Sequence, residues 1–85
     1  MTIAAQLDAI DALAGELSAL AAELGDDVQL CRSTAVSLGA AVGGDAGERA
    51  GAAGSGWSAL LDLVAQQTGV LADRLLVLRE GAAPR

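Results

Sequence analysis

Two stripes of apolar or small side chains, each advancing in steps of three or four residues, constrain the fold of this 85-residue chain most strongly. Steps of this size place side chains on one face of an α-helix. The first stripe predicts a helix over residues 2–42 with Thr2 as its N-cap, and the second predicts a helix over residues 46–80. The only proline is Pro84, so no proline interrupts either helix.

Between the predicted helices lies the glycine-rich sequence GGDAGE, residues 43–48. Glycine just past a helix end readily takes the left-handed conformation that closes the helix. Asp45 followed three residues later by Glu48 fits a capping box, with Asp45 as the N-cap of the second helix. The sequence therefore predicts a tight turn at residues 43–45, with Gly43, Gly44, Asp45 and Glu48 as its turn and cap residues.

Four glycines, at positions 47, 51, 54 and 56, lie in the first part of the second predicted helix. Each destabilises a helix interior by about 1 kcal/mol relative to Ala, so the alternative is a loop here, with the helix starting near Trp57. Gly43, Gly47 and Gly51 lie on one line along a helix, however, where small residues allow two backbones to approach closely. Packing along that line favours the longer helix.

The two stripes also fit one antiparallel register around Gly44. This register pairs Leu38 with Ala50, Cys31 with Trp57, and Leu24 with Val64. A short connection makes the two helices antiparallel neighbours, and at about 1.5 Å per residue they form a rod about 60 Å long. The fold prediction is therefore all-α: an antiparallel two-helix hairpin in a single unit over residues 1–85, with 81–85 as a flexible tail.

The residue counts exclude most catalytic and metal-binding arrangements. The chain has no His and one Cys, Cys31, which provides too few ligands for a zinc site and rules out Ser-His-Asp or Cys-His catalysis. We therefore predict no catalytic, cofactor-binding or metal-binding residues, no small-molecule substrate and no enzyme activity. Cys31 cannot form an internal disulfide and is predicted to be a small buried thiol, with pairing to another chain as the alternative.

The charges are unevenly distributed along the chain. The net charge is −6, and every charged side chain up to Leu30 is acidic. Because a polyanion would be repelled, nucleic-acid binding is not expected. The acidic segment is interpreted as a solvated face, with steering towards a basic partner as the alternative. Charges also interrupt every apolar stretch before it reaches the roughly 18 residues of a membrane span, so stable membrane insertion is not expected.

The apolar positions outnumber those that two helices can bury against each other, and a two-helix unit has too small a core to be stable alone. We therefore predict a protein partner, either a second copy or a related hairpin, in a four-helix bundle; a marginal monomer with an apolar surface is the alternative. Trp57, the only aromatic residue, is either a core anchor against Cys31 or a recognition anchor at the partner surface. The residues assigned to the hairpin seam or the partner interface are Leu17, Leu24, Val28, Trp57, Leu60, Leu61, Leu63, Val64, Val70, Leu71, Leu75 and Leu78.

Two long predicted helices, a tight glycine turn and a single tryptophan are similar to the WxG-like helical-hairpin proteins of type VII (ESX-type) secretion systems. The motif itself is broken, because this chain has Ala59 where the family has glycine two residues after tryptophan. A diverged branch has a Gly-Asp turn, a nearby glycine and a later aromatic residue, and the chain resembles it more closely. Gly44-Asp45, Gly47 and Trp57 occupy those places, and the segment LADRL at 71–75 resembles the branch's later helix.

This resemblance implies a non-enzymatic protein that dimerises and serves as a substrate, co-substrate or helper of type VII secretion. It implies a cytoplasmic location before export, and secretion without a cleavable signal peptide. Family members often carry an export signal of Tyr, three residues and an acid after the second helix, whereas this chain contains no Tyr. A partner that supplies the signal, or a helper that stays in the cytoplasm, is therefore expected. The alternative function is a cytoplasmic adaptor or toxin-neutralising helical partner protein.

Overall fold

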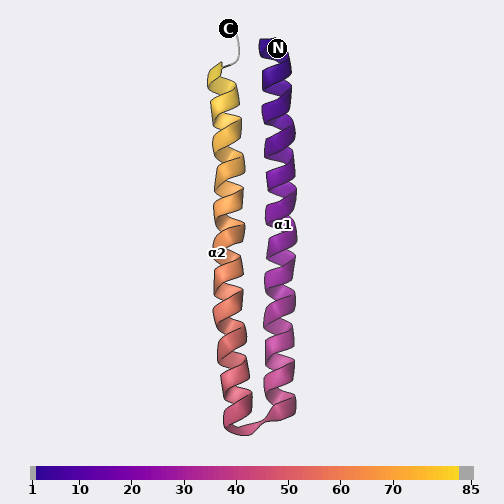
Figure 1. The fold of residues 1–85 in the computed structure, drawn as a ribbon, viewed down its shortest axis with the longest axis vertical. Helices are drawn as coiled ribbons and strands as arrows, with labels where there is room; N and C mark the ends of the chain where they lie inside the picture. The colour runs from indigo at the N-terminus through magenta and orange to yellow at the C-terminus, as the bar shows by residue number, and fades with distance from the viewer. Residues whose placement is uncertain (1, 83–85) are drawn as a thin grey trace.

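A computed structural model describes residues 2–82, which form two long antiparallel helices lying side by side (Figure 1). Helix α1 spans Ile3–Val42 and helix α2 spans Gly44–Ala82. The rod measures 64 × 17 × 14 Å. The predicted all-α hairpin and its length are therefore confirmed. Helix α2 extends two residues beyond its predicted end, so residues 81–82 of the predicted tail are helical; residues 83–85 lie outside the described part of the chain.

Helix α1 begins at the predicted N-cap. Thr2 has an extended backbone, and its Oγ1 accepts a hydrogen bond from the Ala5 N–H at 3.1 Å. The Thr2 carbonyl accepts a second bond from the Gln6 N–H at 3.1 Å. The first bond satisfies an N–H that has no carbonyl partner in the first turn, and the second is the first regular bond of the helix, which is why the helix starts here.

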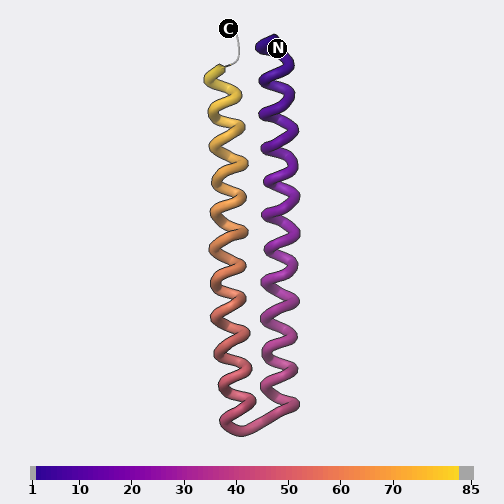
Figure 2. The backbone as a smooth tube through the Cα atoms, in the orientation of Figure 1, coloured from indigo at the N-terminus to yellow at the C-terminus, as the bar shows by residue number. Residues whose placement is uncertain are grey.

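The turn consists of a single residue, Gly43, and the chain reverses within it (Figure 2). Gly43 has φ 70° and ψ 174°, and Gly44 has φ 59°, which are conformations that side chains disfavour. The Gly43 N–H donates to the Gly39 carbonyl and the Gly43 carbonyl accepts from the Gly47 N–H, both at 2.9 Å. Gly43 thus closes one helix and starts the next.

The prediction that Asp45 is the N-cap of the second helix is wrong. Because α2 already begins at Gly44, Asp45 is its second residue rather than the residue before it. The one-residue connection at Gly43 completes the reversal and leaves no place for a separate cap. The Asp45 carboxylate still lies in the first turn of α2, where the positive end of the helix dipole favours an acid.

The seam between the helices is formed by rows of residues spaced seven apart, as in coiled coils. Most of these residues are small, which allows the two helix axes to lie close together. The buried Ser58 hydroxyl donates to the Gly54 carbonyl at 2.8 Å, so its burial leaves no hydroxyl proton without a partner. The central rows are Leu7, Ala14, Ala21, Val28 and Ala35 on α1, and Gly51, Ser58, Ala65, Ala72 and Arg79 on α2.

Near the turn the two backbones are in direct contact. A Cβ added to Gly39 would lie 3.1 Å from the Gly47 carbonyl oxygen, and one added to Gly47 would collide with the Gly39 carbonyl oxygen. A Cβ on Gly54 would collide with the side chain of Ala35. This packing offsets the low helix propensity of the glycines, so the predicted longer helix is confirmed and the loop alternative is wrong.

Far from the turn the helices are joined by side chains instead. Arg79 Nε lies 3.1 Å from Asp11 Oδ1, and it donates a hydrogen bond to Asp11 Oδ2 at 3.2 Å. Both side chains are partly exposed, at 35% and 43%. Leu7 is buried beside them, and Ile10 and Leu75 are half-buried. This end is called the open end below.

Candidate functional site

The seam on α2 differs by one residue from the predicted one. The structure turns Ser58, Ala65 and Ala72 towards α1. A shift of one residue rotates a helix face by about 100°, so the predicted pairings of Cys31 with Trp57 and of Leu24 with Val64 are wrong. Trp57 is not a core anchor. The predicted seam residues that are instead exposed are Trp57 at 64%, Leu60 at 57%, Val64 at 46%, Leu71 at 49% and Leu78 at 60%.

The remaining assigned residues divide between seam and surface. On α1, Val28 is buried and Leu17 and Leu24 are half-buried in the seam, as predicted. On α2, Leu61 and Leu75 are half-buried along the seam. Leu63 and Val70 are exposed and form a row with Val77 on the side of α2 that faces away from α1.

One broad face of the hairpin carries two of the exposed apolar rows, one from each helix, and we call it the Trp57 face. An apolar groove of about 470 Å³ lies on it between the helices. Asp27 and Thr34 line this groove from α1 and Ala50 lines it from α2, so the rows that contain these residues border the same face. The rows are Leu13, Leu20, Asp27 and Thr34 on α1, and Ala50, Trp57, Val64, Leu71 and Leu78 on α2.

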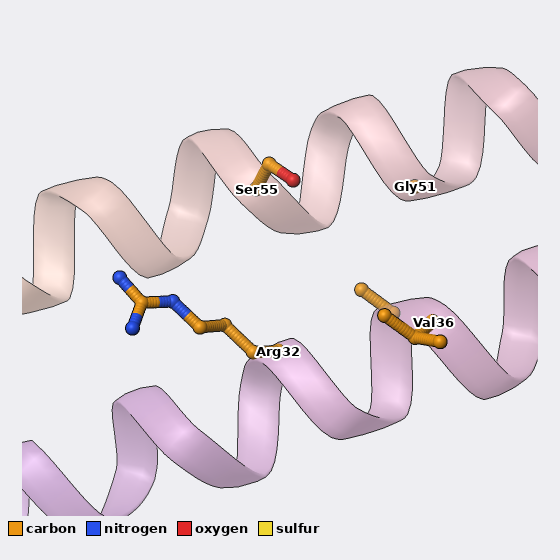
Figure 3. Close-up of a pocket in the computed structure, with 5 residues that line it drawn as sticks. Arg32, Val36, Gly51 and Ser55 are labelled. Atoms are coloured by element: carbon orange, nitrogen blue, oxygen red, sulfur yellow. The ribbon is translucent and has the colours of Figure 1, made fainter.

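The opposite face is more polar, and we call it the Arg32 face. It holds a second groove, of about 530 Å³, lined by Arg32 and Val36 from α1 and by Gly51 and Ser55 from α2. Figure 3 shows the Arg32 side chain reaching from α1 into the space between the helices, with Ser55 on α2. The rows on this side are Asp11, Ser18, Gly25 and Arg32 on α1, and Ser55, Asp62, Gly69 and Leu76 on α2.

Both grooves have the same cause. Gly51 and Gly54 contribute no side chain to the seam, so the space on each side of α2 near the turn stays open. Cys31 lines the groove on the Trp57 face and is half-buried, not buried as predicted. Its Sγ lies 4.0 Å from the Gly54 carbonyl oxygen.

The described residues bring no metal-binding cluster together: residues 2–82 contain no group of three His, Cys, Asp or Glu side chains able to hold an ion. Nor does either helix, over the part described, have the length and apolar character needed to cross a membrane. Among the described residues, the Trp57 face calls for a functional explanation because its large apolar side chains are exposed.

Comparison with known proteins leaves the family open. No family model matches the chain, and neither a curated protein nor a solved structure matches it. The two-helix antiparallel hairpin agrees with the shape that the WxG-like resemblance implies, but a hairpin shape alone assigns no family.

Proposed function

We propose that this chain is a non-enzymatic binding protein whose Trp57 face packs against a helical partner to form a four-helix bundle. The observation that carries the proposal is the exposed row of Trp57, Val64, Leu71 and Leu78 on α2, alongside Leu13 and Leu20 on α1. Burying one such side chain gains roughly 1.5–3 kcal/mol, and a contiguous apolar patch of this kind usually marks an interface.

Trp57 is the proposed anchor of the interface. Its side chain is 64% exposed, and Ala50 of the same row lines the apolar groove, so a partner can cover the indole and fill the groove in one contact. Interface energy is concentrated in such large aromatic side chains where they meet a pocket. We therefore interpret Trp57 as a recognition anchor at the partner surface and not as a core anchor against Cys31.

The resemblance suggests where such a protein would act. A hairpin with a Gly-Asp turn and a later tryptophan supports a role as substrate, co-substrate or helper of type VII secretion. The same face would equally serve a cytoplasmic adaptor or a toxin-neutralising partner. Cell fractionation distinguishes these roles: appearance of the protein outside the cell that is lost on deleting the secretion ATPase supports the first, and retention in both strains supports the second.

Binding through the Trp57 face is tested by Val64→Asp with Ala59→Asp as the matched control. Val64 is half exposed and Ala59 is exposed on the other side of α2, so each variant adds one carboxylate that the hairpin itself can tolerate. Val64→Asp is expected to abolish association, because an apolar interface would have to bury a charge. Ala59→Asp is expected to leave it unchanged.

The readouts are mass by light scattering at tens of micromolar and capture of the partner from cells, with helicity followed by circular dichroism. Association that survives Val64→Asp, with helical content intact in both variants, would refute the proposed use of the Trp57 face.

A further inference from the structure

We propose that the occupant of the Trp57 face is a second copy of this chain, related to the first by a two-fold axis along the rod. The two turns then lie at one end, and α1 of each copy packs on α2 of the other. This inference rests on the proposed function, because it uses the same face. It adds the identity of the partner and the orientation of that partner along the rod.

Two copies that bury the same face can be arranged in two ways, since the two-fold axis lies in the plane between them. An axis along the rod stacks α1 on α2 and keeps both turns at one end. An axis across the rod stacks α1 on α1 and α2 on α2, with the turns at opposite ends. The charges of the chain distinguish these arrangements.

Stacking α1 on α1 brings like charges together. Up to Leu30, α1 carries only acidic charged side chains, and Glu16, Glu23 and Asp27 among them are exposed on or beside the Trp57 face. Like charges across an interface oppose association. Helix α2 instead carries the exposed Arg74, so stacking α1 on α2 replaces repulsion by attraction.

The hairpin itself shows which residues lie at the same height along the rod. In the half of the rod towards the open end, the Arg79–Asp11 ion pair and the approach of Gly69 to Ala21 fix the relative heights of the two helices. Counting the same number of residues along each helix from the ion pair towards the turn puts Glu16 level with Arg74. An axis along the rod keeps heights unchanged, so Glu16 of each copy meets Arg74 of the other, twice in the dimer.

The rows that border the Trp57 face match along their length in this arrangement. Leu30 lines the groove, which places its row at the edge of the face on α1. The corresponding row on α2 contains Leu60, Gln67 and Arg74, and it lies next to the row of Trp57 on the side farther from α1. Acid then meets a hydrogen-bond donor or a cation, and apolar meets apolar: Glu16 with Arg74, Glu23 with Gln67, and Leu30 with Leu60.

The rows inside these borders match as well. At the open end Leu13 meets Leu78 and Leu20 meets Leu71, so the largest aliphatic side chains bury one another. Near the turn, Trp57 of each copy covers the groove of about 470 Å³ on the other, which Thr34 lines. One position does not match, because Asp27 meets Val64 of the second copy.

Charge reversal tests the arrangement. Glu16→Arg alone and Arg74→Glu alone each create like-charge pairs at both symmetry-related sites, and each is expected to weaken dimerisation about tenfold in sedimentation measurements. The double variant restores opposite charges and is expected to recover the wild-type affinity. A double variant as weak as its worse single variant would overturn the stacking of α1 on α2.

The mismatched position gives a test of opposite sign. Asp27→Leu is expected to tighten the dimer about tenfold, because an apolar side chain replaces a carboxylate against Val64. Asp26→Leu, its neighbour on the far side of α1, is the control and is expected to leave the affinity unchanged. Equal effects of the two variants would contradict the assigned face.

The distance between labels on the two turns shows directly whether the turns lie at the same end of the dimer. Asp45→Cys in a Cys31→Ser background, with a spin label on each copy, is expected to give a label separation far shorter than the 64 Å rod. A separation close to the rod length overturns the axis along the rod but leaves the Trp57 face in use. A strictly monomeric chain overturns the second copy as occupant, and capture of another partner that Val64→Asp abolishes would still support the proposed function.

Discussion

The two ends of the rod hold the same two helices together by different means. Near the turn, Gly39 and Gly47 bring backbone against backbone, and nothing larger fits between them. At the open end, Leu7, Ile10 and the Arg79–Asp11 pair bridge the helices with side chains. The contact between Gly39 and Gly47 is thus sensitive to any added atom, whereas the open end is sensitive to atoms removed. Each end should respond to substitution in its own way.

The largest effect is expected from Gly47→Ala. The new Cβ collides with the Gly39 carbonyl oxygen, which belongs to the backbone and cannot rotate away, so we expect a loss of about 3 kcal/mol in unfolding free energy. Gly51→Ala is the control on the same helix, because a Cβ there meets nothing within 4 Å. It should stabilise the chain by about 1 kcal/mol through helix propensity. Urea unfolding followed at fixed concentration by circular dichroism measures both, and the same sign for both would remove the distinction between the two glycines.

The next largest effect is expected from Gly43→Ala. No atom lies in the way of a Cβ at this position, but φ 70° with ψ 174° is a conformation essentially restricted to glycine. We expect destabilisation by about 2 kcal/mol from backbone strain alone, measured in the same unfolding experiment. D-alanine placed there by chemical synthesis accepts a positive φ and should recover most of the loss; no recovery would mean that strain is not the cause.

A smaller gain in stability is expected from Gly25→Ala, near the middle of α1. A Cβ at Gly25 meets nothing within 4 Å, so the substitution only improves helix propensity, by about 1 kcal/mol. Thermal unfolding should show a raised midpoint. A lowered midpoint would show that the close packing of the turn end extends as far as the middle of the rod.

The smallest effect is expected from Arg79→Ala at the open end. The ion pair with Asp11 is partly exposed, so its loss should lower the unfolding free energy by only about 0.5 kcal/mol, and by less at high salt. Comparing unfolding at low and high ionic strength checks this. A loss as large as that of Gly47→Ala would place the main stabilising contact at the open end.

The helices and the turn followed from the sequence because each depends on local rules. Thr2 as N-cap, the spacing of three and four, and Gly43 as a residue of the turn need no knowledge of the rest of the fold. The position of Asp45 was predicted wrongly, because a single glycine completes the reversal and leaves no room for a separate cap.

The seam of α2 did not follow from hydrophobicity. Trp57, Val64 and Leu71 form the more apolar row, yet the smaller Ser58 and Ala72 face α1, because small residues let the helices approach closely along their length. The signal was present in the spacing: small residues recur every seven positions from Gly51 to Ala72. A ranking of residues by hydrophobicity reflects only their transfer free energy and does not include the free energy gained when two helices pack closely. The same ranking left the larger side chains for the surface that we assign to the partner.

The one-residue connection at Gly43 leaves the two helices no slack. Neither helix can slide along the other by a turn, because there is no spare chain to follow the movement, so the hairpin has one longitudinal alignment. Separation of the helices must then start at the open end and progress towards Gly43. Amide exchange along the molecule would accordingly slow in a gradient towards the bend, and the bend would be the last part to lose its structure.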